Sequence, residues 1–370
     1  MMKVGFVKKK FDPFGGGERY LASIIEGLRE EGLDIHVFSS DWKDTGGLTV
    51  HKVKTLRFTS PASVWSFNRN LARALAGMRL DCLVSFERVT FGDVYRAGDG
   101  CHREWLDIRR RVEGSLKSLS FAVNPLHRLL LSMEEEIFRR TRTIIANSRM
   151  VRDDILRHYE VPEGKIRVIY NGVDTRRFTN ENRAGRRRAL RRELGLPEDA
   201  PLVLFAGSGY ERKGLGTLLK ALPDMADPAR VLVAGRGDIK GFSRLAAFLG
   251  VSERTIFLGP RRDIADLYAA SDLFVLPTLY DPFSNATLEA LASGLPVITT
   301  RKNGAAELVE DGEEGYVLSD MLASAELADK ANAILENIGY MSERARRKAE
   351  QYPISGAADE FMEVIRKCLG

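Results

Sequence analysis

Alternation of short apolar strands with amphipathic helices, repeated in two consecutive runs, constrains the fold of this chain more than any other feature. In the first run, the strand pattern Lys3–Val7 is followed by a helix at Glu18–Glu31, whose apolar residues recur every three to four positions. The second run starts with the strand pattern Leu202–Ala206 and repeats the alternation. Parallel strands need helical crossovers. We therefore predict an α/β protein with two Rossmann-like βαβ domains.

The chain length predicts two domains, and one turn indicates the boundary between them. A chain of 370 residues is expected to form two domains. The turn Asn171–Asp174 precedes a polar stretch rich in arginine, which is typical of a domain boundary. We predict an N-terminal domain at residues 1–170, a C-terminal domain at 171–352, and a last helix at 353–370 that crosses back to the first domain. The dense basic run Arg183–Arg192 is interpreted as a solvated helix face rather than a binding patch.

The composition argues against several classes of protein. Cys82, Cys101 and Cys368 are far apart and lack C-x-x-C spacing, which argues against a disulfide framework or a zinc site and fits a reducing cytoplasm. No stretch approaches the roughly 18 uncharged apolar residues of a membrane span, so we expect a soluble cytoplasmic protein. The 56 basic and 51 acidic residues give a formal charge of only +5, and we expect no nucleic-acid partner.

The segment Asp281–Glu289 carries the strongest chemical signal. It follows an apolar strand and leads into a helix that ends at Gly294. Ser284 or Asn285 can cap this helix, and the free N–H groups of its first turn form an anion site. Glu289 lies one turn further on and points back toward that site, so two acids bracket one anion. This arrangement suits a diphosphate flanked by hydroxyl-rich groups; the alternative is a plain turn with a capping acid and a surface charge.

A second phosphate signal, the loop Gly207–Gly214, follows the first strand of the second domain. Its glycines allow the backbone to approach a phosphate closely. Arg212 can hold a phosphate with two N–H groups, and Lys213 supplies a point charge. Together they would stabilise the charge that develops on a departing diphosphate, which can replace a metal ion. No D-x-D metal clamp is visible, so we expect no metal; the alternative for this loop is a charged surface turn.

Two weaker signals follow other strands of the second domain. Ligands of open α/β sheets bind at the carboxyl ends of the strands. Gly235 and Arg236 follow one strand there, and the loop Gly259–Arg262 follows another. A nucleotide base could lie against this second loop, stacked on Arg261 or Arg262.

The first domain offers two candidate segments. Gly15, Gly16 and Gly17 precede a helix and could admit a donor phosphate or sugar, although they do not form the dinucleotide fingerprint G-x-G-x-x-G. Asp99 lies between two glycines after a strand at residues 92–97. We expect it to be exposed at the cleft; the alternative is an ordinary turn aspartate.

These motifs resemble those of the retaining GT-B glycosyltransferases of family 4, over nearly the whole chain. The acid-x7-acid motif with its LEALASGLPV tail is the most specific part, followed by the Arg212–Gly214 loop and the Asn171–Asp174 linker. The Phe-Gly-Gly start and the segment Ala97–His102 resemble more narrowly the members that glucosylate the core of lipopolysaccharide. The resemblance implies the GT-B architecture, two domains facing a cleft, and transfer of a hexose, expected to be glucose, from a UDP-sugar to a hydroxyl acceptor.

The resemblance also assigns roles to individual residues. Asp281 would face the transferred sugar, Lys213 with Arg212 would hold the diphosphate, and Asp99 would match an acid that this subgroup carries where most members have histidine. The donor-binding residues would be Gly15, Gly16, Gly17, Gly207, Gly235, Arg236, Arg261, Arg262, Phe283, Ser284, Asn285, Ala286, Thr287 and Glu289, the last of which would hold the ribose hydroxyls. Asp281 replaces the usual glutamate and Ser208 a frequent arginine, which leaves the donor sugar and the phosphate contact open.

Residues 100–131 mix large apolar side chains with arginine and lysine. A basic amphipathic stretch can lie on an anionic membrane surface, and the resemblance implies such a region in the first domain. We expect peripheral membrane contact here, because a lipid-linked glycan acceptor would require it. The alternative is an ordinary pair of core or interdomain helices.

Two other classes of function compete with transfer. A nicotinamide oxidoreductase would need G-x-G-x-x-G directly after a strand and an acid about 20 residues later, and neither domain offers this cleanly. A sugar-nucleotide epimerase on the same two-domain fold remains open. A non-catalytic protein that binds anionic surfaces or nucleic acid rests on the isoelectric point alone, and the pair Asp281 and Glu289 argues against it.

Overall fold

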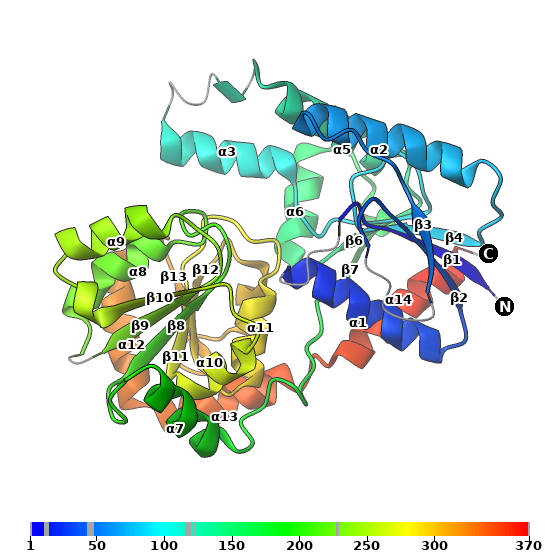
Figure 1. Ribbon diagram of the computed structural model, residues 1–370. Helices are drawn as coiled ribbons and strands as arrows, with labels where there is room; N and C mark the ends of the chain where they lie inside the picture. Colours follow the sequence, from blue (N-terminus) through cyan, green and yellow to red (C-terminus); the bar gives the residue numbers. More distant parts are fainter. Residues whose placement is uncertain are drawn as a thin grey trace. The chain divides into compact units, whose positions relative to one another are not determined.

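The computed structural model describes residues 2–10, 15–42, 48–114, 120–121, 123–226 and 229–368. These divide into two compact units (Figure 1). The N unit comprises Met1–Asn171 and Ile354–Gly370, and the C unit comprises Gly172–Pro353. Each unit is a parallel sheet with helices on both faces, so the predicted α/β class with two Rossmann-like domains is confirmed.

The described strands of the N unit form a parallel sheet in the order β3-β2-β1-β4-β5-β6-β7. Val4 lies opposite both Ile35 and Cys82, which places β1 between β2 and β4. The strands are β1 Lys3–Val7, β2 Asp34–Ser39, β3 Thr49–Lys52, β4 Cys82–Ser85, β5 Val94–Arg96, β6 Thr143–Ala146 and β7 Ile166–Val168. The helices are α1 Gly16–Glu30, α2 Ser60–Leu75, α3 His102–Glu113, α5 Pro125–Arg140, α6 Arg149–His158 and α14 Ile354–Lys367.

Helices α1 and α14 close the core of the N unit. The apolar stripe of α1, including Ile24 and Leu28, is fully buried, and the helix is followed by Gly32 at a φ of +78°. Phe361 and Ile365 of α14 enter the same core cluster as Val4. The last helix of the chain therefore completes the core of the first unit.

The C unit has a parallel sheet whose described strands follow the order β10-β9-β8-β11-β12-β13. All residues of β8, β11 and β12 are buried, as expected for a sheet covered on both faces, whereas the edge strands β10 and β13 are partly exposed at their middle residues. The strands are β8 Leu202–Ala206, β9 Arg230–Ala234, β10 Thr255–Gly259, β11 Leu273–Leu276, β12 Val297–Thr300 and β13 Gly315–Leu318. The α-helices are α7 Arg183–Glu193, α8 Leu215–Ala221, α9 Ile239–Phe248, α10 Ile264–Ala270, α11 Asn285–Ala292, α12 Ser324–Glu336 and α13 Ile338–Ala349.

Strand order defines one switch point in each sheet. In the N unit the chain order reverses between β1 and β4, and in the C unit it reverses between β8 and β11. Loops that leave the carboxyl ends of two such strands diverge to opposite faces and leave a crevice where ligands bind. The candidate residues are therefore judged by their position relative to these two points.

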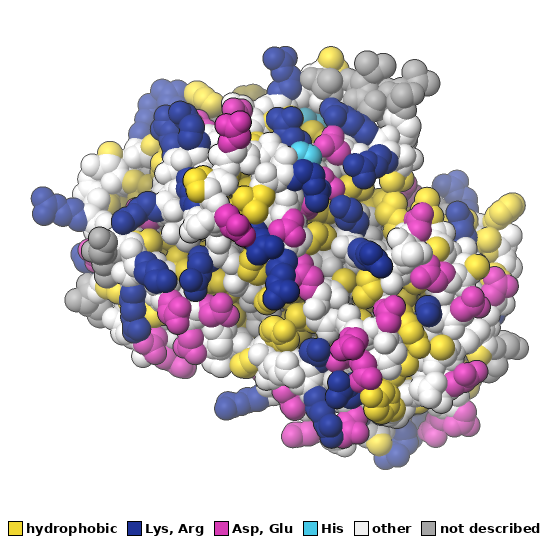
Figure 2. Space-filling view, turned by 180° about the vertical axis from the view of Figure 1, so that it is seen from behind, with side chains coloured by type: hydrophobic (Ala, Val, Ile, Leu, Met, Phe, Trp, Pro, Cys, Tyr) yellow, Lys and Arg dark blue, Asp and Glu magenta, His cyan; other side chains and the backbone are white. Residues whose placement is uncertain are grey.

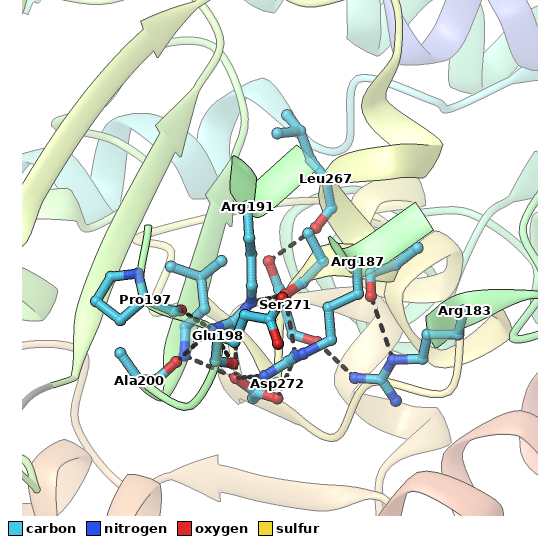
Figure 3. A network of polar contacts seen from close by, with 12 residues as sticks. Arg183, Arg187, Arg191, Pro197, Glu198, Ala200, Leu267, Ser271 and Asp272 are labelled. Carbon is cyan, nitrogen blue, oxygen red and sulfur yellow. Dashed lines mark hydrogen bonds and ion pairs between the residues drawn. The ribbon is translucent and has the colours of Figure 1, made fainter. Parts of the chain in front are cut away.

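The basic helix α7 corrects one interpretation of the sequence. Arg183, Arg187 and Arg191 do not form a solvated face but reach across to the end of α10 and to Asp272 (Figure 3). Arg191 is 1% exposed, donates to Asp272 at 2.9 Å and also donates to four backbone carbonyls, those of Pro197, Glu198, Ala200 and Ala270. These arginines satisfy carbonyl groups that α10 leaves without helical partners. Only the exposed members, such as Arg188, fit the solvated-face interpretation.

No helix among the described residues combines the length and the apolar content that crossing a membrane would need. The longest described helices, α2 and α5, have 16 residues each and carry several arginines.

We predict that Arg191→Met destabilises the protein by about 3–5 kcal/mol, because it removes one partner of a buried ion pair and leaves several carbonyls without donors. Arg188→Met, on the exposed side of the same helix, should change stability by less than about 0.5 kcal/mol. Urea denaturation followed by circular dichroism measures both. Equal effects of the two variants would contradict the buried role of Arg191.

Candidate functional site

The switch point of the C unit brings together two residues from the two strongest motifs. Lys213 lies on the loop after β8, and Asp281 on the loop after β11; the Lys213 Nζ donates to Asp281 Oδ2. Both side chains are about nine-tenths buried, with 12% and 9% exposed. Burial lowers the pKa of the Lys213 ammonium, Asp281 opposes this shift, and Arg212 adds to it. The result is a buried cation with one anionic partner, in the crevice where ligands of such sheets bind.

Two glycines allow the neighbouring loops to approach this point. Gly235, after β9, has a φ of +119°, and a Cβ there would lie 2.2 Å from the carbonyl oxygen of Gly207. Gly214 has a φ of +82°, and a Cβ there would lie 2.0 Å from the carbonyl oxygen of Pro277. Any side chain at either position would push two loops apart. The loops after β8, β9 and β11 are therefore packed backbone against backbone around Lys213.

Arg212 supports the loop that carries Asp281. Its Nη1 donates to the Tyr280 carbonyl at 2.8 Å, and its own carbonyl accepts from Leu279 N and Thr278 Oγ1 at 2.8 and 3.0 Å. Part of the guanidinium is thus already used within the protein. The predicted two-pronged grip on a phosphate would have to use its remaining N–H groups.

The start of α11 lies beside the ion pair. Ser284 is the capping residue, and its Oγ accepts from Thr287 N at 3.3 Å. The helix ends before Gly294, which has a φ of +72°. Phe283 is buried, whereas Asn285 and Ala286 are partly exposed. The first turn of α11 thus has two partly exposed residues and begins shortly after Asp281, the partner of the buried Lys213, a combination that favours an anion.

Asn303 is a structural centre of this site that the sequence analysis missed. Its Oδ1 accepts from Ser284 N and Ala305 N, both at 3.1 Å. Its Nδ2 donates to the hydroxyls of Thr287 and Thr299 at 3.1 and 2.9 Å. The neighbouring backbone completes the frame, since Asp281 N donates to Lys302 O and Gly304 N donates to Asp281 O. One buried amide thus ties the cap of α11 to the chain that holds Asp281. In the sequence, the only indication of this role is that Asn303 precedes a glycine in the turn after a strand.

Glu289, the second acid of the motif, lies on the second turn of α11 and is partly exposed. Its Oε2 lies 3.1 Å from the hydroxyl of Tyr268, which also lies 3.0 Å from the carbonyl of Ala286. The acid is therefore held at one oxygen by a buried tyrosine of α10.

The arginines of the weaker motifs differ in how far they are engaged. Arg261 makes a two-pronged contact with Asp263 and reaches Glu193 at 3.2 Å, and these acids raise its pKa. Its Nε and Nη2 are engaged with these acids, so a base would contact the face of the guanidinium or Nη1. Arg236 is exposed, and its backbone N–H donates to Ser208 Oγ at 3.3 Å. Arg262 is exposed and also takes part in an interaction within the protein.

The switch point of the N unit gathers charges of both signs. Asp99, after β5, is 55% exposed and lies 3.4 Å from Nη1 of Arg88. Arg88, after β4, is largely buried and lies 3.1 Å from the fully buried Glu134. Lys8, after β1, lies 3.7 Å from Glu18 in the first turn of α1. Asp99, Glu87 and Glu18 raise the pKa of Lys8, although burial, the largest single effect, lowers it.

The three predicted glycines of the N unit lie at the start of α1. Gly15 precedes the helix with extended backbone, and Gly16 and Gly17 form its first residues. A Cβ at Gly17 would meet nothing within 4 Å. Internal packing of the N unit therefore does not require glycine at 17.

The basic stretch 100–131 is only partly described, because residues 115–119 and 122 lie outside the described residues. Within the described part, the Arg109 guanidinium stacks on the rings of Trp105 and Phe121, at 5.8 and 4.2 Å from their centroids. Val112 and Val123 are exposed, at 42% and 75%. On the face shown in Figure 2, lysine and arginine side chains are interspersed with acidic ones over much of the surface.

Comparisons with known proteins fit this geometry. Residues 14–177 match the family profile described as Glycosyltransferase Family 4, and residues 200–337 match that of Glycosyl transferases group 1. The chain is a glycosyltransferase of the family 4 type. It is 24% identical to the lipopolysaccharide glucosyltransferase WaaG of Escherichia coli, over 98% of both chains. It is 31% identical to the D-inositol 3-phosphate glycosyltransferase of Xylanimonas cellulosilytica, over 62% of this chain and 58% of that enzyme.

Solved structures confirm the GT-B fold of this family 4 chain. The crystal structure of WaaG matches with a TM-score of 0.85, covering 98% of this chain and 99% of that one at 24% identity. The structure of HepE from Anabaena in complex with UDP-glucose matches with a TM-score of 0.77, covering 99% of this chain and 100% of that one at 21% identity. The oxidoreductase alternative has no support among these relatives.

We predict that Asn303→Ala loosens the start of α11, because it removes the acceptor of two buried amides and the donor to two buried hydroxyls. Hydrogen exchange in a peptide covering residues 281–288 should become at least about tenfold faster, since local opening costs less free energy. Exchange in the peptide covering β9 should change much less. Asn337→Ala, at an exposed position, is the control, and an unchanged 281–288 peptide in Asn303→Ala would contradict the role of Asn303.

Proposed function

We propose that this protein is a retaining, metal-independent hexosyltransferase that moves glucose from UDP-glucose to a hydroxyl of a glycan acceptor. One observation carries the proposal: Lys213, Asp281 and the start of α11 meet at the switch point of the C unit. A buried lysine beside a helix N-terminus suits a diphosphate. A carboxylate beside them suits the hydroxyl groups of a sugar joined to that diphosphate.

The chemistry follows from where charge develops. When the bond between the sugar and the diphosphate breaks, negative charge grows on the departing phosphate oxygens. Lys213, the free N–H groups of Arg212 and the backbone at Asn285–Thr287 would take up this charge, in a setting fixed before reaction. Breaking the Lys213–Asp281 contact frees the ammonium for the phosphate and the carboxylate for the sugar. The acceptor hydroxyl attacks the same face that the diphosphate leaves and gives its proton to a phosphate oxygen.

The two units would bind different parts of the substrates. In the C unit, Glu289 would hold the ribose hydroxyls, and the loops carrying Gly207, Gly235, Arg236, Arg261 and Arg262 would surround the nucleotide. In the N unit, the glycines at 15–17 would admit the donor sugar, and Asp99, steadied by Arg88, would stabilise the cation-like sugar in the transition state. The N unit would also bind the acceptor.

The acceptor proposal is a lipopolysaccharide core or another lipid-linked glycan. The similarity to the lipopolysaccharide glucosyltransferase WaaG over almost the whole chain supports it. Residues 100–131 would then lie at an anionic membrane surface on the cytoplasmic side, with exposed apolar residues such as Val112 among arginines. The proposed donor is supported by the UDP-glucose complex of the similarly folded HepE.

We expect Lys213→Ala and Glu289→Ala each to reduce turnover of UDP-glucose at least about 100-fold, because each removes a charged contact to the donor. Lys220→Ala, at an exposed position in the last turn of α8, should retain wild-type turnover. Release of UDP in a coupled assay measures all three. Near-normal rates for both site variants would refute the assignment of the site.

A second prediction concerns metal and stereochemistry. Transfer should proceed unchanged in excess EDTA, because cationic side chains and helix amides supply the charge that a metal ion would otherwise provide. Proton NMR of the product should show that the α-anomeric configuration of UDP-glucose is kept. A strict requirement for Mg²⁺ or Mn²⁺, or an inverted β-product, would contradict the mechanism.

A further inference from the structure

Tyr268 occupies a fixed position beneath the second acid of the site. Its ring is fully buried and makes a T-shaped contact with Phe178 and a tilted contact with Phe274, at centroid distances of 5.8 and 5.9 Å. It belongs to α10, whose last carbonyls accept from Arg183, Arg187 and Arg191 of α7 (Figure 3). The tyrosine is thus held by the core on one side and by an arginine network at the end of its helix.

The hydroxyl of Tyr268 is shared by two acceptors on α11. It lies 3.1 Å from Glu289 Oε2 and 3.0 Å from the carbonyl oxygen of Ala286. A hydroxyl has one proton, so it can donate fully to only one of these oxygens at a time. Because the buried ring is held by the core, its hydroxyl fixes the position of the Glu289 carboxylate and of the Ala286 carbonyl in the first turn of α11.

We infer that Tyr268 is a positioning residue that holds the carboxylate of Glu289 in the orientation needed to bind a ribose diol. This inference rests on the proposed function, in which Glu289 contacts the ribose of the donor. A partly exposed glutamate has three side-chain torsions, and ordering them on binding costs free energy. The fixed tyrosine supplies that order in advance, which improves affinity without any contact between Tyr268 and the ligand.

The two acceptors also explain how the contact accommodates a ligand. When two ribose hydroxyls donate to Glu289, the Tyr268 proton can turn to the Ala286 carbonyl without leaving a buried group unpaired. Tyr268 therefore affects recognition of the ribose more than any other part of the donor.

The test compares a ribonucleotide with its 2′-deoxy counterpart by isothermal titration calorimetry on the full chain. The probes are UDP and 2′-deoxy-UDP, so no acceptor is needed. The wild-type protein should bind UDP about tenfold more tightly than 2′-deoxy-UDP, as expected for one hydrogen bond to a charged group. Tyr268→Phe should lower UDP affinity by about three- to tenfold and leave 2′-deoxy-UDP affinity nearly unchanged, which reduces the affinity ratio from about ten to about one to three.

Two further variants separate positioning from general damage. In a Glu289→Ala background, adding Tyr268→Phe should change neither affinity further, because the group that Tyr268 positions is gone. Tyr340→Phe removes a tyrosine–glutamate contact with Glu313 on the exposed surface of the same unit and should keep the wild-type ratio.

The outcomes distinguish this inference from the function on which it rests. If the wild-type protein does not bind UDP, the donor of the proposed function is wrong. If it binds UDP and 2′-deoxy-UDP equally, or if Tyr268→Phe keeps the wild-type ratio, the positioning role is wrong while a UDP-sugar donor stands. Equal loss of affinity for both nucleotides in Tyr268→Phe would indicate packing damage and would also overturn the inference.

Discussion

The buried contact between Lys213 and Asp281 is the interaction on which the site depends. Taking an ammonium and a carboxylate out of water is costly, and each is tolerated there because the other is present. A lone lysine at this depth would tend to lose its proton and with it the ability to hold an anion. The pair thus keeps a positive charge available at the switch point of the C unit, and in the proposed function a ligand of suitable polarity releases that charge by separating the two partners.

The rest of the C unit serves to hold this contact in place. Glycines at 214 and 235 let three loops touch through their backbones, and Asn303 ties the cap of α11 to the chain around Asp281. On the far side, the arginines of α7 fix α10, and α10 carries the tyrosine that meets Glu289. Rigid surroundings suit electrostatic catalysis, because dipoles that are already oriented need no rearrangement when charge develops.

The sequence predicts those features of the fold and the site that depend on residues close to one another in the chain. The strand and helix alternation, the cap at Ser284 and the stop at Gly294 follow from short-range rules of hydrogen bonding and backbone conformation. The sequence could not reveal contacts between distant segments. The sequence around Arg191 predicts a solvated side chain because its partner Asp272 lies 81 residues away, and the sequence around Asn303 does not indicate its role because its partner Ser284 belongs to another loop. Charge and polarity in a sequence do not say whether a side chain will find a buried partner.

The return of α14 to the N unit bears on how the chain is made. Phe361 and Ile365 fill part of the core that β1 and α1 line, yet they follow the whole C unit in the chain. The N unit cannot bury its full core until the whole C unit has been synthesised, whereas the C unit is continuous from Gly172 to Pro353. The C unit can therefore complete its core before the N unit does, although synthesis of the N unit begins first. During synthesis the nascent N unit carries an uncovered apolar surface that a chaperone can recognise.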